Sequence, residues 1–163
     1  MSLIEIGAKD SLLTLRELTS QDAAVYYALV DANRDHLTRH GDYQDLKVAT
    51  LESVTADLDS VVAGHLCFGA WYRGELVGRF DLIRRAPGNF VLGYWLGKDS
   101  TGRGFATVAG DALIQYGRKH LGATDIWAGV TKGNDASVAV LHRLGLQAVE
   151  DMGEYTRFHR AVS

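Results

Sequence analysis

The chain has 163 residues, of which 47% are apolar and 23% charged, so it is long enough to bury one hydrophobic core. No repeat, low-complexity tract or proline-rich linker divides it, and we expect a single domain over residues 1–163. The formal net charge of -3 offers no basic field, which argues against a nucleic-acid partner. The first residues lack a signal-peptide pattern and no apolar run reaches membrane-spanning length, so we expect a cytoplasmic protein with no membrane partner.

The chain has a single cysteine, Cys67, which excludes an intramolecular disulfide and a cysteine-based metal site. The apolar residues around Cys67 favour a buried thiol over a catalytic nucleophile. We expect no metal ion.

The first third of the chain predicts one strand followed by two helices. The strand is expected near residues 12–18. Thr19 with Asp22 three residues later is typical of a capping box that opens a helix. The apolar face of this helix is expected to consist of Val25, Ala28, Leu29 and Ala32. A second helix is expected after Thr50, with a face made of Leu51, Val54, Leu58 and Val61.

The centre of the chain predicts three strands joined by short turns, an antiparallel meander over residues 66–72, 76–84 and 90–96. A glycine-rich turn then leads into the most regular amphipathic pattern of the chain. Its apolar positions are Phe105, Val108, Ala109, Ala112, Leu113 and Tyr116. A strand over 125–130, a helix over 134–144 and strands over 147–150 and 155–160 complete the order. This order predicts an α/β protein with a mixed, mostly antiparallel central sheet of about seven strands and about four helices.

The turn before the amphipathic helix has the features of an anion site. Gly102 and Gly104 let the backbone approach a ligand, and the unpaired amides at the helix start point outward at the positive end of the helix dipole. A pyrophosphate fits such a site. A dinucleotide fingerprint would need a third glycine where Thr107 stands, and Asp125 begins its strand instead of ending it, so a nicotinamide-dependent oxidoreductase is disfavoured.

The same turn resembles the pyrophosphate loop of the GNAT acyltransferases, which reads Gln/Arg-x-x-Gly-x-Gly/Ala. The matching residues are Thr101-x-x-Gly104-x-Ala106, with Thr101 in place of the usual Gln or Arg. This departure removes one side-chain contact to the ligand and leaves the backbone amides unchanged.

A second motif in the expected order strengthens the resemblance. Asn134-x-x-Ser137, followed by an apolar stretch and Gly145, is similar to the Asn-x-x-Ser/Ala motif of the same family. Residues 94–96, 104–107 and 32–37 most resemble the RimJ/RimL branch. The resemblance covers nearly the whole chain and implies the GNAT fold with acetyl-CoA as cosubstrate.

The resemblance also implies which residues form the site. Those expected to bind the cosubstrate are Tyr94, Trp95, Leu96, Thr101, Gly102, Arg103, Gly104, Phe105, Ala106, Thr107, Asn134, Ser137 and Arg143. Asn33 and His36 are expected to bind the acceptor. The alternative for Asn134 is a plain helix cap, and the alternative for Arg143 is a solvated helix face. Since many relatives form dimers, a homodimer is one expected partner state.

Ser137 is the proton donor implied by the RimL-like pattern. Many GNAT enzymes use a tyrosine seven residues after the motif asparagine to protonate the leaving thiolate, but Leu141 stands there. Ser137 lies on the same helix face as Asn134, with a hydroxyl that can reach the sulfur. The alternative is an ordinary small residue that faces the strand.

The general base is less well defined, because residues 90–96 lack the acid that the family usually places on this strand. The candidates are Glu154, Asp81, His142 and His36. Glu154 is preferred, since related enzymes place an acid late in the chain; the alternative is a solvated turn glutamate. The oxyanion would need a backbone amide near residues 94–96, where the pantetheine arm would pair as an added strand.

Together these features predict an N-acetyltransferase that transfers acetyl from acetyl-CoA directly to a primary amine within a ternary complex. The amine is a protein N-terminus or a small molecule. An α-amine with a pKa of about 8 is about one-tenth neutral at pH 7, whereas a lysine amine near about 10.4 is almost wholly charged, so an N-terminal acceptor tolerates a weaker base. The alternative is a non-catalytic acyl-CoA-binding sensor, favoured by the missing tyrosine and the unassigned base.

Overall fold

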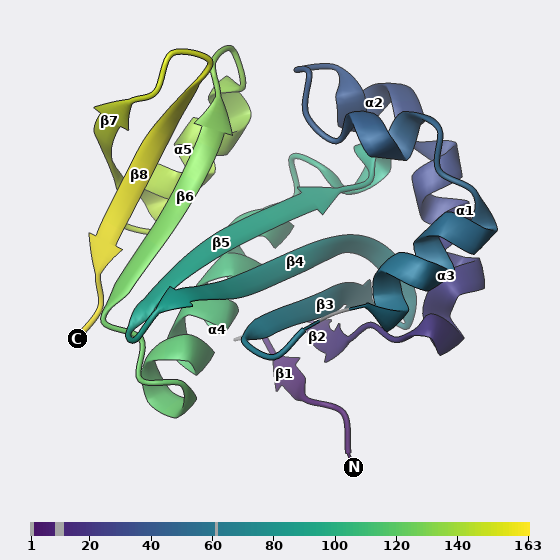
Figure 1. Ribbon diagram of the computed structural model, residues 1–163, viewed down its shortest axis with the longest axis horizontal. Helices are drawn as coiled ribbons and strands as arrows, with labels where there is room; N and C mark the ends of the chain where they lie inside the picture. The colour runs from purple at the N-terminus through teal and green to yellow at the C-terminus, as the bar shows by residue number, and fades with distance from the viewer. Residues whose placement is uncertain (1, 9–11, 61) are drawn as a thin grey trace.

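The computed structural model describes residues 2–8, 12–60 and 62–163, and its strands form one sheet of order β1-β2-β3-β4-β5-β6-β8-β7 (Figure 1). The strands are β1 (Glu5–Gly7), β2 (Leu13–Glu17), β3 (His65–Tyr72), β4 (Glu75–Ala86), β5 (Asn89–Leu96), β6 (Asp125–Thr131), β7 (Gln147–Asp151) and β8 (Tyr155–Ala161). The helices are α1 (Ala23–Ala32), α2 (Arg34–Thr38), α3 (Leu51–Asp59), α4 (Phe105–His120) and α5 (Asp135–Arg143), with 3-10 turns η1 (Ser20–Asp22), η2 (Gln44–Lys47) and η3 (Lys98–Ser100). Among the described strand pairs only β5–β6 is parallel, which confirms the mixed, mostly antiparallel α/β sheet.

The structure has two elements beyond the seven strands and four helices expected from the sequence. They are the three-residue strand β1 and the five-residue helix α2. Neither is long enough for a hydrophobic period to emerge from the sequence, so periodicity misses both. The other elements lie within two or three residues of their expected bounds.

The buried face of α1 differs from the expected one. The capping box of Thr19 and Asp22 is present, but Val25 is 43% exposed and the helix instead buries Ala23, Tyr26 and Val30. Tyr26 can occupy the core because its ring packs on Trp95 at 5.9 Å and its hydroxyl accepts a hydrogen bond from Arg79. In α3 the expected Val54 and Leu58 are buried and Leu51 is 47% exposed, while Val61 lies outside the described residues.

The buried face of α4 is turned relative to the expected one because glycines lie at its closest contacts. The buried residues are Phe105, Ala106, Ala109, Gly110, Leu113, Ile114 and Gly117. A Cβ on Gly110 would lie 2.7 Å from the Leu144 side chain, and one on Gly117 would lie 3.1 Å from Leu82. A pattern that counts only larger apolar residues therefore points to the half-buried Val108 and Ala112 instead.

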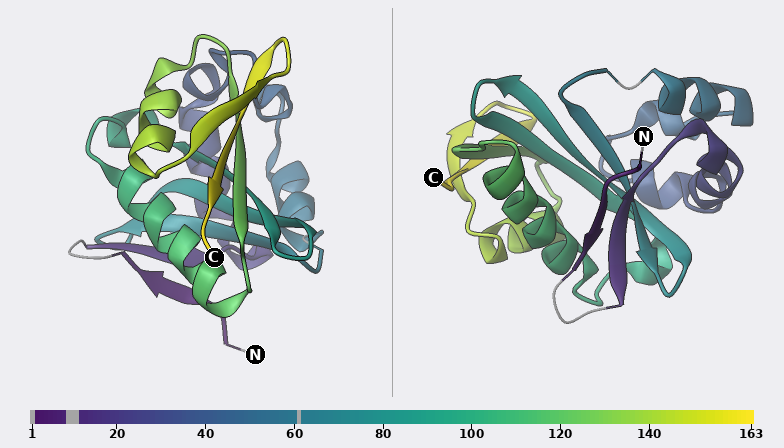
Figure 2. Two further views of the ribbon diagram at one scale, coloured as in Figure 1. Left: turned by 90° about the vertical axis from the view of Figure 1, so that its left-hand side faces the viewer. Right: turned by 90° about the horizontal axis from the view of Figure 1, so that it is seen from below.

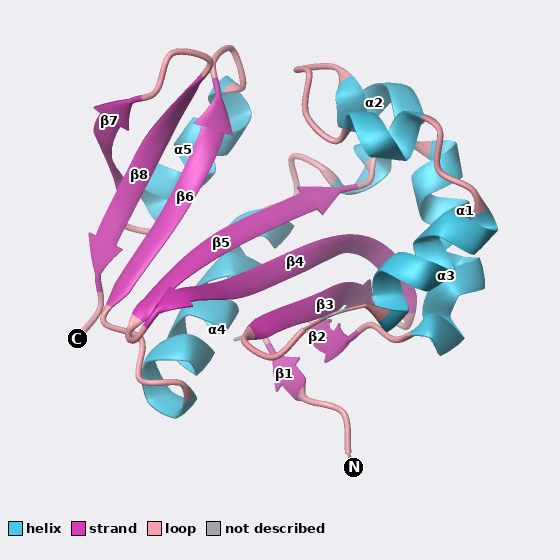
Figure 3. Ribbon diagram, in the orientation of Figure 1, coloured by secondary structure: helices cyan, strands magenta, loops and turns pink. Residues whose placement is uncertain are grey.

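Helices cover the two faces of the sheet unequally (Figures 2 and 3). α4 and α5 pack on one face, over a core that includes Phe80, Leu113 and Phe158. α1 and α3 pack on the other face over β3 and β4, around Tyr26 and Trp95. On that second face no described helix lies over β6 and β8 (Figure 3).

Cys67 is buried in β3 on the α1 side of the sheet, at 4% exposure. Burial, with the Asp81 carboxylate nearby, raises the pKa of its thiol to about 12. The expected buried thiol is therefore confirmed. None of the described helices is both long enough and apolar enough to cross a bilayer.

Candidate active site

The central feature of the site is the divergence of β5 and β6. The two strands pair in parallel only from Asn89/Asp125 to Val91/Trp127 and then separate (Figure 1). Beyond this point a small cavity of about 80 Å³ lies between them. Its lining comes from β5, β6, the start of α5 and the loop before η2: Asp42, Tyr43, Leu92, Gly93, Tyr94, Ala128, Gly129, Val130, Thr131, Asn134, Ser137 and Leu141. We call this cavity the slot.

The edge of β5 that faces the slot carries backbone groups that β4 does not use. Gly97 N–H donates to the Val77 carbonyl at 2.9 Å. Since hydrogen-bonded and non-hydrogen-bonded pairs alternate in an antiparallel ladder, Trp95 bonds to β4, whereas Tyr94 and Leu96 turn their N–H and C=O groups toward the slot side. The backbone groups that the sequence analysis expects to meet the pantetheine arm and the oxyanion therefore face the slot, and their roles stay predictions.

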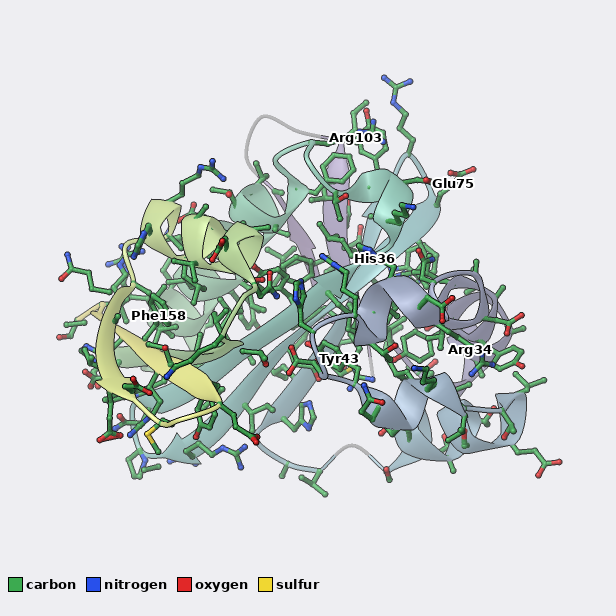
Figure 4. The ribbon with its side chains drawn as sticks, turned by 90° about the horizontal axis from the view of Figure 1, so that it is seen from above. Arg34, His36, Tyr43, Glu75, Arg103 and Phe158 are labelled. Atoms are coloured by element: carbon green, nitrogen blue, oxygen red, sulfur yellow. The ribbon has the colours of Figure 1, made fainter. Side chains whose placement is uncertain are left out.

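Side chains from the segment around α2 form hydrogen bonds with the carbonyl groups of this edge. The Tyr43 hydroxyl donates to the Tyr94 carbonyl at 3.1 Å, and His36 Nε2 bonds to the Leu96 carbonyl at 3.1 Å. Arg34 holds the segment in place through the carbonyls of residues 46, 47 and 49. In Figure 4 His36 and Tyr43 lie together between the two halves of the sheet. The carbonyls are thus satisfied by the protein, and the N–H groups remain for a ligand.

His36 and Asn33, the expected acceptor-binding residues, both lie at the end of β5. His36 Nδ1 lies 3.0 Å from the Arg39 guanidinium; burial, then this charge, lowers the pKa of His36, so the ring is neutral at pH 7. Asn33 accepts from Lys98 N–H at 2.8 Å and donates to the Leu29 carbonyl at 2.8 Å. Their polar atoms are therefore committed to positioning the end of the strand and its following turn.

The glycine-rich turn forms the expected helix start. Gly102 and Gly104 have φ of +72° and +80°, a region that side chains rarely adopt, and α4 begins at Phe105. The first intrahelical bond runs from Val108 N–H to the Gly104 carbonyl, so the amides through Thr107 have no partner within the helix. The predicted anion site would be made of these amides.

Two side chains of the turn are placed by contacts within the protein. The Arg103 guanidinium lies over the rings of Tyr72 and Phe105, at 4.9 Å and 4.7 Å from their centres (Figure 4). The Thr101 hydroxyl donates to the Lys98 carbonyl at 2.7 Å. The Thr101 side chain therefore closes the turn, and the expected loss of one ligand contact stays a prediction.

The other expected cosubstrate residues divide into backbone and side-chain contributors. The Trp95 and Leu96 side chains are buried in the two cores, so only their backbone can meet a ligand. Asn134 accepts from Ser137 N–H at 3.2 Å and so caps α5, the alternative role. Arg143 lies exposed in the last turn of α5, away from the slot end of that helix, which favours the solvated alternative.

Ser137 forms a hydrogen bond with Tyr94, a contact that the sequence analysis did not predict. Tyr94 O–H donates to Ser137 Oγ at 3.2 Å across the slot, while its ring stacks on Phe80 at 5.3 Å. Burial raises the pKa of Tyr94, the hydrogen bond to Ser137 working in the opposite direction, so the phenol stays protonated at neutral pH. The two hydroxyls form a protonated pair beside the edge of β5.

Of the candidate bases, Glu154 is an exposed residue beside a cavity. It lines a cavity of about 480 Å³ that borders the slot at Asp42, Gly129 and Thr131. The Asp81 carboxylate is held by Arg79 at 2.8 and 2.9 Å and by His65. Burial opposes its ionisation, but these bonds outweigh burial and lower its pKa, which makes Asp81 a poor base.

His142 lies exposed in the last turn of α5, edge-on to Phe158, and does not line the slot. Within the described residues no group of three or more His, Cys, Asp and Glu side chains could hold a metal ion. Sequence reasoning missed Asp42 and Tyr43, because nothing in their local pattern signals contacts with Thr131 and Tyr94 far along the chain.

Comparisons with known proteins agree with this geometry. Residues 13–147 match the family model described as an acetyltransferase (GNAT) domain. The putative ribosomal N-acetyltransferase YdaF of Bacillus subtilis is 27% identical over 145 residues, covering 82% of this chain and 76% of YdaF. The structure of RimL, a ribosomal L7/L12 alpha-N-protein acetyltransferase in complex with coenzyme A, superposes with a TM-score of 0.87 at 17% identity, covering 98% of each chain. Mycobacterium smegmatis RimJ has a TM-score of 0.81 at 22% identity, covering 98% of this chain and 86% of its own. The similarity to the RimL and RimJ structures shows the fold. Because the family model matches residues 13–147, most of the chain, the chain belongs to the GNAT acetyltransferase family.

Proposed function

We propose that the chain transfers the acetyl group of acetyl-CoA directly to a protein N-terminal α-amine within a ternary complex. The observation that carries the proposal is the slot, which is bordered by edge amides on β5 and by the Tyr94–Ser137 hydroxyl pair. YdaF and RimL, named as N-terminal or ribosomal acetyltransferases, support this choice of acceptor.

The residues present fit the parts of acetyl-CoA. The amides at the start of α4 suit its pyrophosphate, since they combine unpaired donors with the positive end of the helix dipole. Of the two edge N–H groups, those of Tyr94 and Leu96, one suits a carbonyl of its pantetheine arm and the other suits the acyl oxygen of its thioester. When bound, acetyl-CoA supplies an activated thioester.

The chain's own groups would assist three steps. A backbone N–H of the β5 edge stabilises negative charge on the acyl oxygen as the amine nitrogen forms its bond to carbon. Ser137 donates a proton to the sulfur as the carbon–sulfur bond breaks, Tyr94 passes its own hydroxyl proton to Ser137, and water returns a proton to Tyr94. The amine loses its proton to water or to Glu154, and an α-amine with a pKa of about 8 needs only a weak base.

A non-catalytic acyl-CoA sensor remains the second candidate. It is favoured by Thr101, whose hydroxyl is used within the turn, and by Asp81, whose carboxylate is committed to an ion pair. The two candidates differ in turnover, not in binding.

The test combines both measurements on the same protein. Binding of acetyl-CoA is measured by calorimetry, and release of CoA is followed with N-terminal peptides, free amino acids, polyamines and aminoglycosides. Binding with turnover of peptides supports the proposal. Binding with no turnover of any amine identifies a sensor, and turnover of small amines alone refutes the N-terminal acceptor.

A further inference from the structure

A groove runs along the uncovered face of β6 and β8. The cavity of about 480 Å³ and a second one of about 360 Å³ share Gly129 and Tyr155, and the first also borders the slot. Their lining residues Trp127 and Arg157 alternate along the strands with residues such as Phe158 that are buried in the core. We call the two joined cavities the acceptor groove.

The charge of the acceptor groove changes sign along its length. At the slot end it is lined by Asp42 and Glu154, which suit a protonated or partly protonated amine. At the far end it is lined by Arg85 and Arg157. Asp125, the acid nearest this end in sequence, is held by His159 at 2.7 Å.

Contacts within the protein hold side chains at the far end of the acceptor groove in place. Arg85 is the extra residue of a β-bulge between Arg84 and Ala86, and no ion pair of Arg85 is found within the described chain. The Arg157 guanidinium lies 4.6 Å from the centre of the Trp127 ring, and Trp127 Nε1–H donates to Asn89 at 2.9 Å. The aromatic floor and one cation above it are thus held in place.

Arg157 also pairs with Glu150 at 3.2 Å, but both side chains are largely exposed, at 40% and 52%. Exposed pairs of this kind contribute little, so a carboxylate of a ligand can compete for the guanidinium.

The length of the groove sets which ligand residue meets the arginines. Thr131, at the slot end, and Trp127, at the far end, are four residues apart on β6, which corresponds to about 13 Å at a rise of about 3.3 Å per residue. An extended peptide with its α-amine at the slot would bring its third or fourth residue to Arg85 and Arg157. A small amine would leave that end empty.

We propose that the acceptor is an extended protein N-terminus with Asp or Glu at its third or fourth residue, seated in the acceptor groove. This inference rests on the proposed function, because it takes the slot as the place of acetyl transfer. It adds a charge preference that the transfer chemistry does not require.

The test uses matched peptides that differ only in having Glu or Lys at residues three and four. We expect kcat/KM to be about tenfold or more higher for the Glu peptide at low salt, with the ratio shrinking in about 0.5 M NaCl, since rim charges act mainly through screened steering. The double variant Arg85→Glu/Arg157→Glu should reverse the preference. Glu150→Ala, which frees Arg157, should increase it. Arg118→Glu/Lys119→Glu, which makes the same total charge change at the exposed end of α4, is the control and should leave the ratio unchanged.

The outcomes separate this inference from the proposed function. Acetylation of both peptides at equal rates, or a ratio that the double variant leaves unchanged, overturns the charge preference while the function stands. Failure of every peptide, with acetyl-CoA still bound, refutes the function first. An altered sedimentation coefficient of the double variant with an unaltered peptide ratio would mean that a second copy of the chain occupies the groove, which also overturns the inference. A thermal shift by acetyl-CoA verifies that each variant is folded.

Discussion

The hydroxyl pair in the slot makes a specific kinetic prediction. Because Tyr94 O–H donates to Ser137 Oγ at 3.2 Å, the hydrogen of Ser137 itself is free to turn into the slot. Ser137→Ala removes that hydrogen and leaves the helix cap at Asn134 intact, since the cap uses the Ser137 backbone N–H. The change should therefore lower kcat by about 10²-fold, the usual scale for a positioned acid, with little change in acetyl-CoA affinity.

Tyr94→Phe separates two roles of the tyrosine. The ring and its stacking on Phe80 remain, and one neutral hydrogen bond worth about 1 kcal/mol is lost. If Tyr94 only orients Ser137, kcat should fall about fivefold, which is this energy expressed as a rate. If Tyr94 supplies the proton, the fall should approach that of Ser137→Ala. In either case the double variant should be no slower than the slower single variant, because the two groups act as one unit.

The assay follows CoA release with a thiol reagent, and calorimetry gives the affinity for acetyl-CoA. Tyr116→Phe, a half-buried tyrosine on α4 that packs against His120, is the matched control and should change neither quantity. Weaker acetyl-CoA binding with an unchanged kcat in Ser137→Ala would refute the acid role. The proton would then come from water, and the enzyme would work mainly by proximity.

Three further predictions concern the fold and the anion site. Acetyl-CoA at about 100 times its Kd should stabilise the native state by about 2.7 kcal/mol and raise Tm by about 5–10 °C in a thermal melt; no shift at millimolar concentration would count against the site. Gly104→Val should abolish acetyl-CoA binding, because φ is +80° there and the added side chain would project beside the amides at the start of α4. The control is Gly122→Val, with φ of +68° near the other end of α4, which should lower stability without changing the affinity for acetyl-CoA. Equal affinities of the two variants for acetyl-CoA would remove the turn from the site. Because the pKa of Asp81 is lowered in the folded protein, its ion pair stabilises the fold above the unfolded pKa near 3.8, and this stabilisation is lost as pH falls through the lower folded pKa. Asp81→Asn should therefore have a lower Tm than the unmodified protein at pH 7, and this difference in Tm should narrow from about pH 5 downward. A difference in Tm that does not change with pH would contradict this.

The sequence predicted elements whose signals are local. The capping box at Thr19, the helix start after Thr50, the meander and the glycine turn before α4 each depend on residues within a few positions of one another, and each is present. The helix faces were predicted less well, since burial depends on the partner surface. Tyr26 is buried because Arg79, far along the chain, meets its hydroxyl.

The geometry of the candidate site could be predicted from the sequence where a backbone motif defines it, and not where distant side chains meet. The start of α4 needs only glycines and a following helix, so Gly102 and Gly104 suffice to find it. The Tyr94–Ser137 pair joins residues 43 positions apart, and the bond from Tyr43 to Tyr94 joins residues 51 apart. Propensity and periodicity carry no information on such contacts.

The diverging edge of β5 presents a problem that the α2 segment solves. A strand that leaves its neighbour exposes both donors and acceptors, and such an edge tends to pair with another strand. Here Tyr43 and His36 bond to the carbonyls of Tyr94 and Leu96, so the acceptors of the edge are satisfied from within the chain. Only donors remain, and donors are what an acyl oxygen and the carbonyls of an extended arm require. The same two side chains thus protect the edge from other strands and leave the donors that our proposal assigns to the acyl oxygen and to the pantetheine arm.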